Sequence, residues 1–191
     1  MGLLDPPGFR RNRHGEIWLH LPPDDRALLD SLLEQLRVLL APDDDTAPGG
    51  APPDPLADFV GIDPTAVRPA DPALARLFPD ADEDPHEADE FRRFTQRELR
   101  TGKLANARTA AATLARPNPT RLSSEECRAW VAALNDLRLT LGTRLAVTED
   151  GAGPFLDLPD TDPRRDLYLV YDWLTYHQDR LVHALDKGVR E

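Results

Sequence analysis

The chain has 191 residues and a formal net charge of −11, and 40% of its residues are hydrophobic. A chain of this length can bury a full core, which predicts a single domain over residues 1–191. The acidic balance argues against broad electrostatic binding to nucleic acid or anionic membranes. No apolar run approaches the roughly 18 residues of a transmembrane helix, and the first residues lack a signal-peptide pattern, so we expect a cytoplasmic protein without membrane contact.

The first part of the chain predicts extended backbone followed by one helix. Alternating apolar side chains between Phe9 and Leu21 indicate a short strand or extended arm. Leucines at helical spacing begin after Pro23, and Pro42 ends this helix. Residues 42–55 are rich in Pro, Gly and Asp, so they are expected to form a flexible linker.

The middle of the chain is expected to be helical in pieces. Short helical turns are predicted over Leu56–Ile62 and Pro72–Phe78, with Asp71 as the N-cap of the second. A longer helical stretch runs from Pro85 to Leu114, and Thr-Gly at 101–102 predicts a break. Two helices around a glycine also suggest a helix-turn-helix, but the acidic charge and the alanine-rich second half favour a bent helix packed on the core.

Basic residues concentrate between Arg92 and Arg121, whereas acids crowd the first half of the chain. Such a local patch could contact phosphates even on an acidic protein, although charged helix faces are usually just solvated. The sequence leaves open whether this stretch contacts nucleic acid. Direct DNA binding is not expected, because a nucleic-acid footprint normally shows in the overall charge of a domain.

Residues Trp130–Thr148 predict the central helix of an all-α helical bundle. The pattern is apolar over most of the helix circumference and leaves a narrow polar strip through Asp136, Thr140 and Arg144. A surface helix needs only one apolar face, so this helix should be surrounded by other elements. Gly142 is costly inside a helix, which indicates close approach of a neighbouring helix or, alternatively, a kink.

A second long helix is predicted over Asp166–Leu185. Beside its core stripe lie Trp173, Tyr176 and Arg180, residue types that are enriched at protein interfaces. We interpret these three as a candidate partner surface. The alternative is that they pack under the N-terminal segment of the chain, since aromatics dominate cores as well. The expected core stripe comprises Leu167, Val170, Tyr171, Leu174, Leu181 and Leu185.

Three polar residues lie beside the apolar stripes of these two helices: Asn135, Arg138 and Asp172. Buried charges persist only when they are paired, so we predict a structural polar cluster in which Arg138 meets Asp172 or another acid. The alternative is that each side chain reaches solvent at the rim.

Catalytic and metal-binding signatures are not found in the sequence, and no cofactor is expected. The five histidines are not at the i, i+4 spacing of a helical metal pair. Ser124 is placed as a helix N-cap, three residues before the single cysteine, Cys127. A lone cysteine allows no disulfide within the chain, so Cys127 is a redox candidate only through sulfenic acid or a bond to another molecule.

Five segments carry a family resemblance that covers nearly the whole chain. The segments ALNDLRLTLGTRL (133–145) and VYDWL (170–174) resemble hallmark segments of an actinobacterial family of AosR-type oxidative-stress transcriptional regulators, once described as a domain of unknown function. The pieces LADFVGI (56–62), DPALARLFPD (71–80) and LRTGKLANA (99–107) follow in the order that the family leads us to expect.

The resemblance implies a non-enzymatic regulator that contacts a stress sigma factor or RNA polymerase under oxidation. Members are often encoded near a Clp-protease adaptor and a sulfur-carrier cysteine-synthesis system, so an adaptor or accessory protein for proteolysis or sulfur metabolism is the alternative. A C-x-x-x-C redox pair that began at Cys127 would need cysteine at position 131, which is valine here. This departure puts direct disulfide sensing in doubt. The oligomeric state and the regulated genes remain open.

Overall fold

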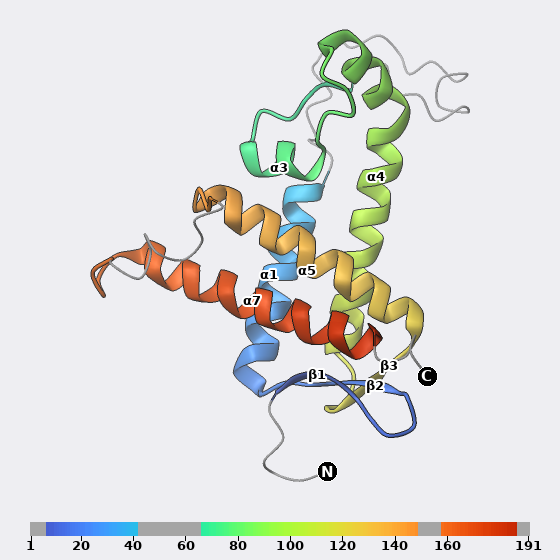
Figure 1. The fold of residues 1–191 in the computed structure, drawn as a ribbon, viewed down its shortest axis with the longest axis vertical. Helices are drawn as coiled ribbons and strands as arrows, with labels where there is room; N and C mark the ends of the chain where they lie inside the picture. The colour runs from blue at the N-terminus through green and yellow to red at the C-terminus, as the bar shows by residue number, and fades with distance from the viewer. Residues whose placement is uncertain (1–6, 42–65, 149–157, 187–191) are drawn as a thin grey trace.

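The computed structural model describes residues 7–41, 66–148 and 158–186 and is mainly helical, with a small antiparallel sheet (Figure 1). The predicted linker at 42–55 and the predicted turn at 56–62 lie outside the described residues. The elements are β1 (Gly8–Arg11), β2 (Ile17–His20), α1 (Pro23–Leu40), α3 (Pro72–Leu77), α4 (Pro85–Leu114), β3 (Thr120–Leu122), α5 (Ser124–Arg144) and α7 (Pro163–Asp186).

The N-terminal segment forms a hairpin that a distant strand completes. β1 pairs with β2, and β2 pairs with β3, so the strand order is β1-β2-β3. The turn of the hairpin is fixed by Asn12, whose side-chain oxygen accepts the backbone N–H groups of His14 and Glu16 at 2.9 Å each. The short strand was expected, but β3 was not, because its three residues carry almost no alternation.

α1 and α3 begin and end close to their predicted bounds. α1 starts with a proline in its first turn and buries the leucines at 29, 33, 36 and 40. The side chain of Asp71 caps α3 as predicted, since it accepts the backbone N–H groups of Ala73 and Leu74. Both helices pack against the core, which α3 reaches through the buried side chains of Leu74 and Leu77.

α4 is one continuous helix of 30 residues, so the predicted break at residues 101–102 and the helix-turn-helix alternative are wrong. Gly102 has open space where a side chain would be, and its only cost is that of a glycine in a helix, about 1 kcal/mol. The helical residues on both sides of Gly102 stabilise α4 by more than this cost. Asp84 caps the helix by accepting the backbone N–H groups of His86 and Glu87.

α5 is the central helix, as predicted. It contacts α1, α3, α4, α7 and β3, and Trp130 and Leu134 are fully buried on it. Its N-cap is Ser123 rather than the predicted Ser124, because Ser123 and Glu126 form a reciprocal capping box. The helix ends at Arg144, earlier than predicted, and Ala146 beyond it has a positive φ of 52°.

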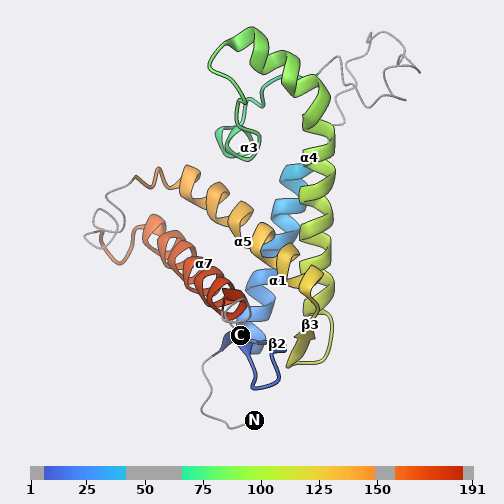
Figure 2. The same ribbon diagram turned by 45° about the vertical axis from the view of Figure 1, so that its right-hand side comes forward.

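α7 lies along α5 in both ribbon views (Figures 1 and 2). A Cβ atom added at Gly142 of α5 would lie 3.3 Å from the Tyr171 ring of α7, so this glycine marks the predicted close approach of two helices. Leu174 and Leu181 are buried as predicted. Leu167 is exposed, and His177 takes a fully buried place in the stripe instead, which corrects the predicted core face.

Candidate partner-binding surface

The predicted partner surface on α7 is divided between the core and solvent. Leu169 and Tyr176 are 56% and 43% exposed. Trp173 is partly buried and packs against the core, with its ring 4.4 Å from that of His177. The Arg180 guanidinium lies over the Tyr176 ring, 5.6 Å from its centroid. Tyr176 is therefore accessible to a partner, which keeps it a candidate, whereas Trp173 packs against the protein's own core.

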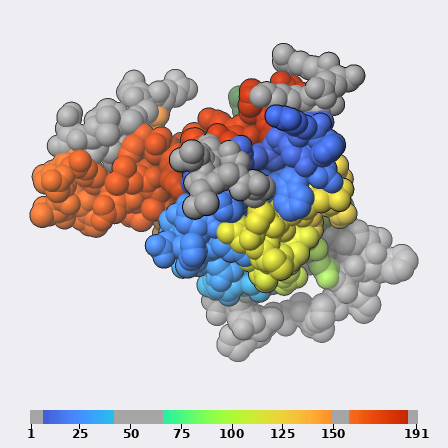
Figure 3. All heavy atoms as spheres, turned by 90° about the horizontal axis from the view of Figure 1, so that it is seen from below, coloured from blue at the N-terminus to red at the C-terminus, as the bar shows by residue number. Residues whose placement is uncertain are grey.

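A groove of about 910 Å³ adjoins this surface, where β1 meets the last turns of α7. Figure 3 shows the β1–β2 hairpin beside the C-terminal half of α7 on this face. β1 contributes Arg10 and Arg11, and α7 contributes Tyr176, Asp179 and Arg180 among its lining residues. We call Leu169, Trp173, Tyr176 and Arg180 the α7 stripe, since they recur at helical spacing and lead into this groove.

His177 is a buried residue that the sequence analysis missed. It is 1% exposed, and both ring nitrogens lack a hydrogen-bond partner. Its ring packs edge-on against those of Phe9, Trp173 and Tyr176. Burial, with a smaller contribution from the positive charge of Arg180, lowers the pKa of His177 to about 4. His177 lies at helical spacing from the buried Leu174 and Leu181, and this spacing was the available signal. A histidine at such a position is equally compatible with a surface location.

The predicted polar cluster of Asn135, Arg138 and Asp172 does not form. Asn135 and Asp172 are exposed. Arg138 binds neutral partners on α7, since its Nε donates to Thr175 Oγ1 at 2.9 Å and its terminal nitrogen donates to Gln178. Its guanidinium also lies 5.5 Å from the centroid of the Tyr171 ring. The predicted acid is replaced by hydroxyl, amide and aromatic groups, which hold a half-buried charge without a carboxylate.

An ion pair that involves a buried carboxylate lies on the opposite side of α5. Asp136 is 2% exposed and accepts a hydrogen bond at 2.7 Å from Nζ of Lys103 on α4. Burial raises the pKa of Asp136, and Lys103 opposes that rise. Asp136 was predicted to lie on the narrow polar strip of this helix, and the structure shows that the strip is buried at this residue. Apolar residues surround Asp136 in the helical pattern, so the sequence did not indicate which neighbouring helix carries its charge partner.

Cys127 is buried in the hydrophobic core. Burial, together with the negative charge of Glu126, raises the pKa of the Cys127 thiol to about 11. A thiol reacts with oxidants as thiolate, so this environment disfavours the redox role considered for Cys127.

The basic stretch between Arg92 and Arg121 is largely occupied by contacts within the protein. Arg92 is buried and pairs with Asp80. Arg100 donates to the backbone oxygens of Leu40 and Ala41 at the end of α1. Further along, Lys103, Arg116 and Arg121 pair with Asp136, Glu126 and Glu16. These contacts favour a structural role for the stretch over phosphate binding.

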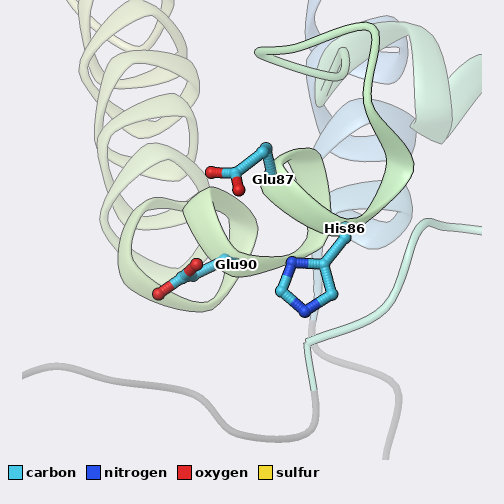
Figure 4. A group of neighbouring side chains, drawn as sticks. All are labelled: His86, Glu87 and Glu90. Atoms are coloured by element: carbon cyan, nitrogen blue, oxygen red, sulfur yellow. The ribbon is translucent and has the colours of Figure 1, made fainter.

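The first turns of α4 carry an exposed group of His86, Glu87 and Glu90 (Figure 4). Their nearest potential ligand atoms lie within 4.8 Å of one another, which in kind would suit a divalent cation. All three residues are exposed. In metal sites, neighbouring groups normally hydrogen-bond to the ligand side chains and orient them. The hydrogen bonds that the structure shows for His86 and Glu87 involve their backbone N–H groups, which donate to the capping Asp84. We assign no function to the group.

Among the described residues, no helix is long and apolar enough to cross a membrane.

The segments that carry the family resemblance meet inside the protein. Lys103 of LRTGKLANA pairs with Asp136 of ALNDLRLTLGTRL. Gly142 and Arg138 of the latter segment contact Tyr171 of VYDWL. These contacts connect α4, α5 and α7 at the segments that carry the resemblance.

Comparisons with known proteins agree with the family resemblance. The model of a family described as a domain of unknown function, DUF2017, matches residues 6–185. The chain is 34% identical over 197 aligned positions to the oxidative stress regulator AosR of Mycobacterium bovis, across 95% of this chain and 84% of that protein. The AosR of Mycobacterium tuberculosis strain H37Rv gives the same values. The putative AosR of Mycobacterium leprae is 33% identical over 85% of this chain and 79% of its own length. No solved structure matches. Since the family model spans nearly the whole chain, the protein belongs to the DUF2017 family and is related to the AosR proteins.

Proposed function

We propose that this protein is a cytoplasmic, non-enzymatic regulator of the oxidative-stress response that acts by protein contact with the transcription machinery, through a stress sigma factor. The similarity over 95% of the chain to proteins named oxidative stress regulators carries the regulatory role. The exposed Leu169 and Tyr176 on α7 support the protein contact, because solvent-exposed aliphatic and aromatic side chains gathered on one helix are typical of interfaces.

The burial of Cys127 limits how such a regulator would respond to oxidants. A thiol with a pKa of about 11 carries very little thiolate near neutral pH. We therefore propose that the oxidant acts on a partner or on the amount of this protein, and that this chain binds in the same way whether or not its thiol is intact.

The experiment that tests this function is an affinity capture with the full chain as bait, from cells with and without peroxide treatment. Recovery of a sigma factor or RNA polymerase, with altered expression of stress genes in a deletion strain, is the expected result. A bait with Tyr176→Ala separates specific capture from background. Recovery of Clp components or enzymes of sulfur metabolism, without polymerase subunits, would replace the regulator with an adaptor or accessory protein.

A further inference from the structure

The α7 stripe combines exposed apolar side chains with one arginine that lacks a charge partner among the described residues. Leu169 and Tyr176 are the exposed apolar members, and Arg180 lies over the Tyr176 ring. Arg180 makes no ion pair with any residue in the described part of the chain, and its Nε is shielded from solvent without a hydrogen-bond partner. A guanidinium in this state gains from a carboxylate, which can accept two parallel hydrogen bonds from it.

The groove next to Arg180 has the same charge preference. Arg10, Arg11 and Arg180 line it, against two acids, Asp179 and Asp186. The Arg11 guanidinium is held at the groove by a hydrogen bond of 3.5 Å to the backbone oxygen of Ala184. On a chain with a net charge of −11, a groove in which arginines outnumber acids is a local exception. Electrostatic complementarity then selects an acidic binding partner.

The length of the stripe sets the size of that partner segment. Leu169 and Arg180 lie eleven positions apart on one helix, which corresponds to about 16 Å, or three helical turns. An amphipathic helix of similar length can cover such a stripe with side chains at i, i+3, i+4 and i+7.

We propose that the α7 stripe and the adjoining groove bind an amphipathic acidic segment of a protein partner, with apolar side chains on Leu169 and Tyr176 and a carboxylate at Arg180. This inference rests on the proposed function, which supplies the protein partner. It adds the binding face and the chemistry of the bound segment.

The first measurement uses the partner that the capture experiment tests. The affinity of a purified stress sigma factor is compared between the wild-type chain and the variants Arg180→Glu, Arg180→Gln and Arg108→Glu. Arg108 is an exposed arginine on α4, so its variant carries the same charge reversal away from the groove. We expect Arg180→Glu to weaken binding by about tenfold or more, Arg180→Gln by less, and Arg108→Glu by no more than about twofold. Thermal unfolding of each variant shows whether the fold is kept.

The second measurement does not depend on the sigma factor. A synthetic peptide of about 14 residues, with leucines on one helical face and glutamates beside them, is titrated into the full chain and followed by amide NMR. We expect shifts confined to β1 and the α7 stripe. A matched peptide with glutamine in place of glutamate should bind more weakly by about fivefold or more, as a charged hydrogen bond is lost.

The ring of His177 supplies a readout that a purely structural role of Arg180 would not give. The charge of Arg180 contributes to the lowered pKa of His177. A carboxylate bound at Arg180 should therefore raise the pKa of His177 in the complex, and the glutamine peptide should not.

The outcomes separate this inference from the proposed function. Peptide binding without sigma-factor binding would keep the groove and refute the function. Sigma-factor binding that Arg180→Glu leaves unchanged would keep the function and refute the groove. Equal binding of the glutamate and glutamine peptides, or a dimer of the free chain that Arg180→Glu dissociates, would also overturn the inference.

Discussion

The two sides of α5 treat polar residues differently. Toward α4, Asp136 accepts through Oδ1 from Lys103, and Trp130 donates to the hydroxyl of Thr113 at 2.9 Å, although Oδ2 of Asp136 has no hydrogen-bond partner. Toward α7 and β1, Arg138 binds neutral groups at a half-buried position, and His177 is buried without any hydrogen bond. The α4 side is therefore held by an ion pair and a hydrogen bond of buried side chains, whereas the α7 side combines the hydrogen bonds of a half-buried arginine with ring packing.

This difference favours the α7 side of α5 as the candidate partner surface. An interface held by buried polar pairs tolerates few rearrangements, because moving either element strands a charge. Ring packing around His177 tolerates small shifts at lower cost. The α7 stripe and its groove lie on this second side, where a partner could bind with little disturbance of the core.

The largest expected effect comes from stranding Asp136. Lys103→Met should destabilise the protein by about 3 kcal/mol, since the carboxylate stays buried without its cation. The loss of stability should be smaller at about pH 5 than at about pH 7. Burial raises the pKa of the Asp136 carboxyl in the folded protein, so the folded state binds this proton more tightly than the unfolded chain. The free energy of unfolding therefore falls as the pH rises through the folded pKa. Chemical denaturation at both pH values measures this.

A double variant checks the cause. Lys103→Met with Asp136→Leu should recover most of the lost stability, because two apolar side chains of similar volume replace the pair. If the double variant were as unstable as Lys103→Met alone, packing rather than charge would hold α4 on α5.

His177 should make the α7 side sensitive to acid. Its folded pKa of about 4 lies below the ordinary 6.5, so the unfolded chain binds the proton first. Stability contributed by neutral His177 is full above about pH 6.5 and is lost progressively as pH falls toward about 4, by roughly 3 kcal/mol in total. His177→Phe should lack this loss. An identical pH dependence in the variant would show that other groups cause it, and exposed His183→Phe is the control.

Arg138 should matter less than Lys103. Arg138→Ala removes bonds to Thr175 and Gln178 at a half-buried site, which should cost about 1 to 2 kcal/mol. Urea unfolding compares it directly with Lys103→Met. A larger loss for Arg138→Ala would reverse the contrast between the two sides of α5.

The smallest effect is expected at Cys127. Cys127→Ala should cost about 1 kcal/mol, because only one sulfur leaves the core. The native thiol should react with a thiol reagent far more slowly than in denaturant, and sigma-factor capture with peroxide should be the same for both chains. A peroxide response that the variant loses would make Cys127 the sensor after all.

Helix periodicity predicted most of this fold but not its polar contacts. The bounds of α1 and α4, the central place of α5 and the close approach at Gly142 follow from patterns that burial imposes on a helix. Whether Asp136 or Arg138 meets an opposite charge depends on which side chain the neighbouring helix places opposite that residue. That information lies in residues dozens of positions away, so no local pattern contains it.

The candidate site was predicted in part for a related reason. The helical spacing of Trp173, Tyr176 and Arg180 identified their face, because spacing within one helix is local. Which of them the hairpin would shield depended on β1. The position of β1 rests on its pairing with β2, which in turn pairs with the distant strand β3. The groove with Arg10 and Arg11 was therefore not predictable from α7 alone.

The three-stranded sheet also sets the order in which this protein can assemble. Leu21, beside β2, and Asn118, beside β3, are hydrogen-bonded although 97 positions separate them. During synthesis the hairpin leaves the ribosome long before its third strand exists, and contacts between such distant segments are slow to close. Phe9 packs against Trp130 of α5 and His177 of α7, so a nascent chain carries this side of its future core uncovered until both helices have been made. Chaperones would matter most in that interval.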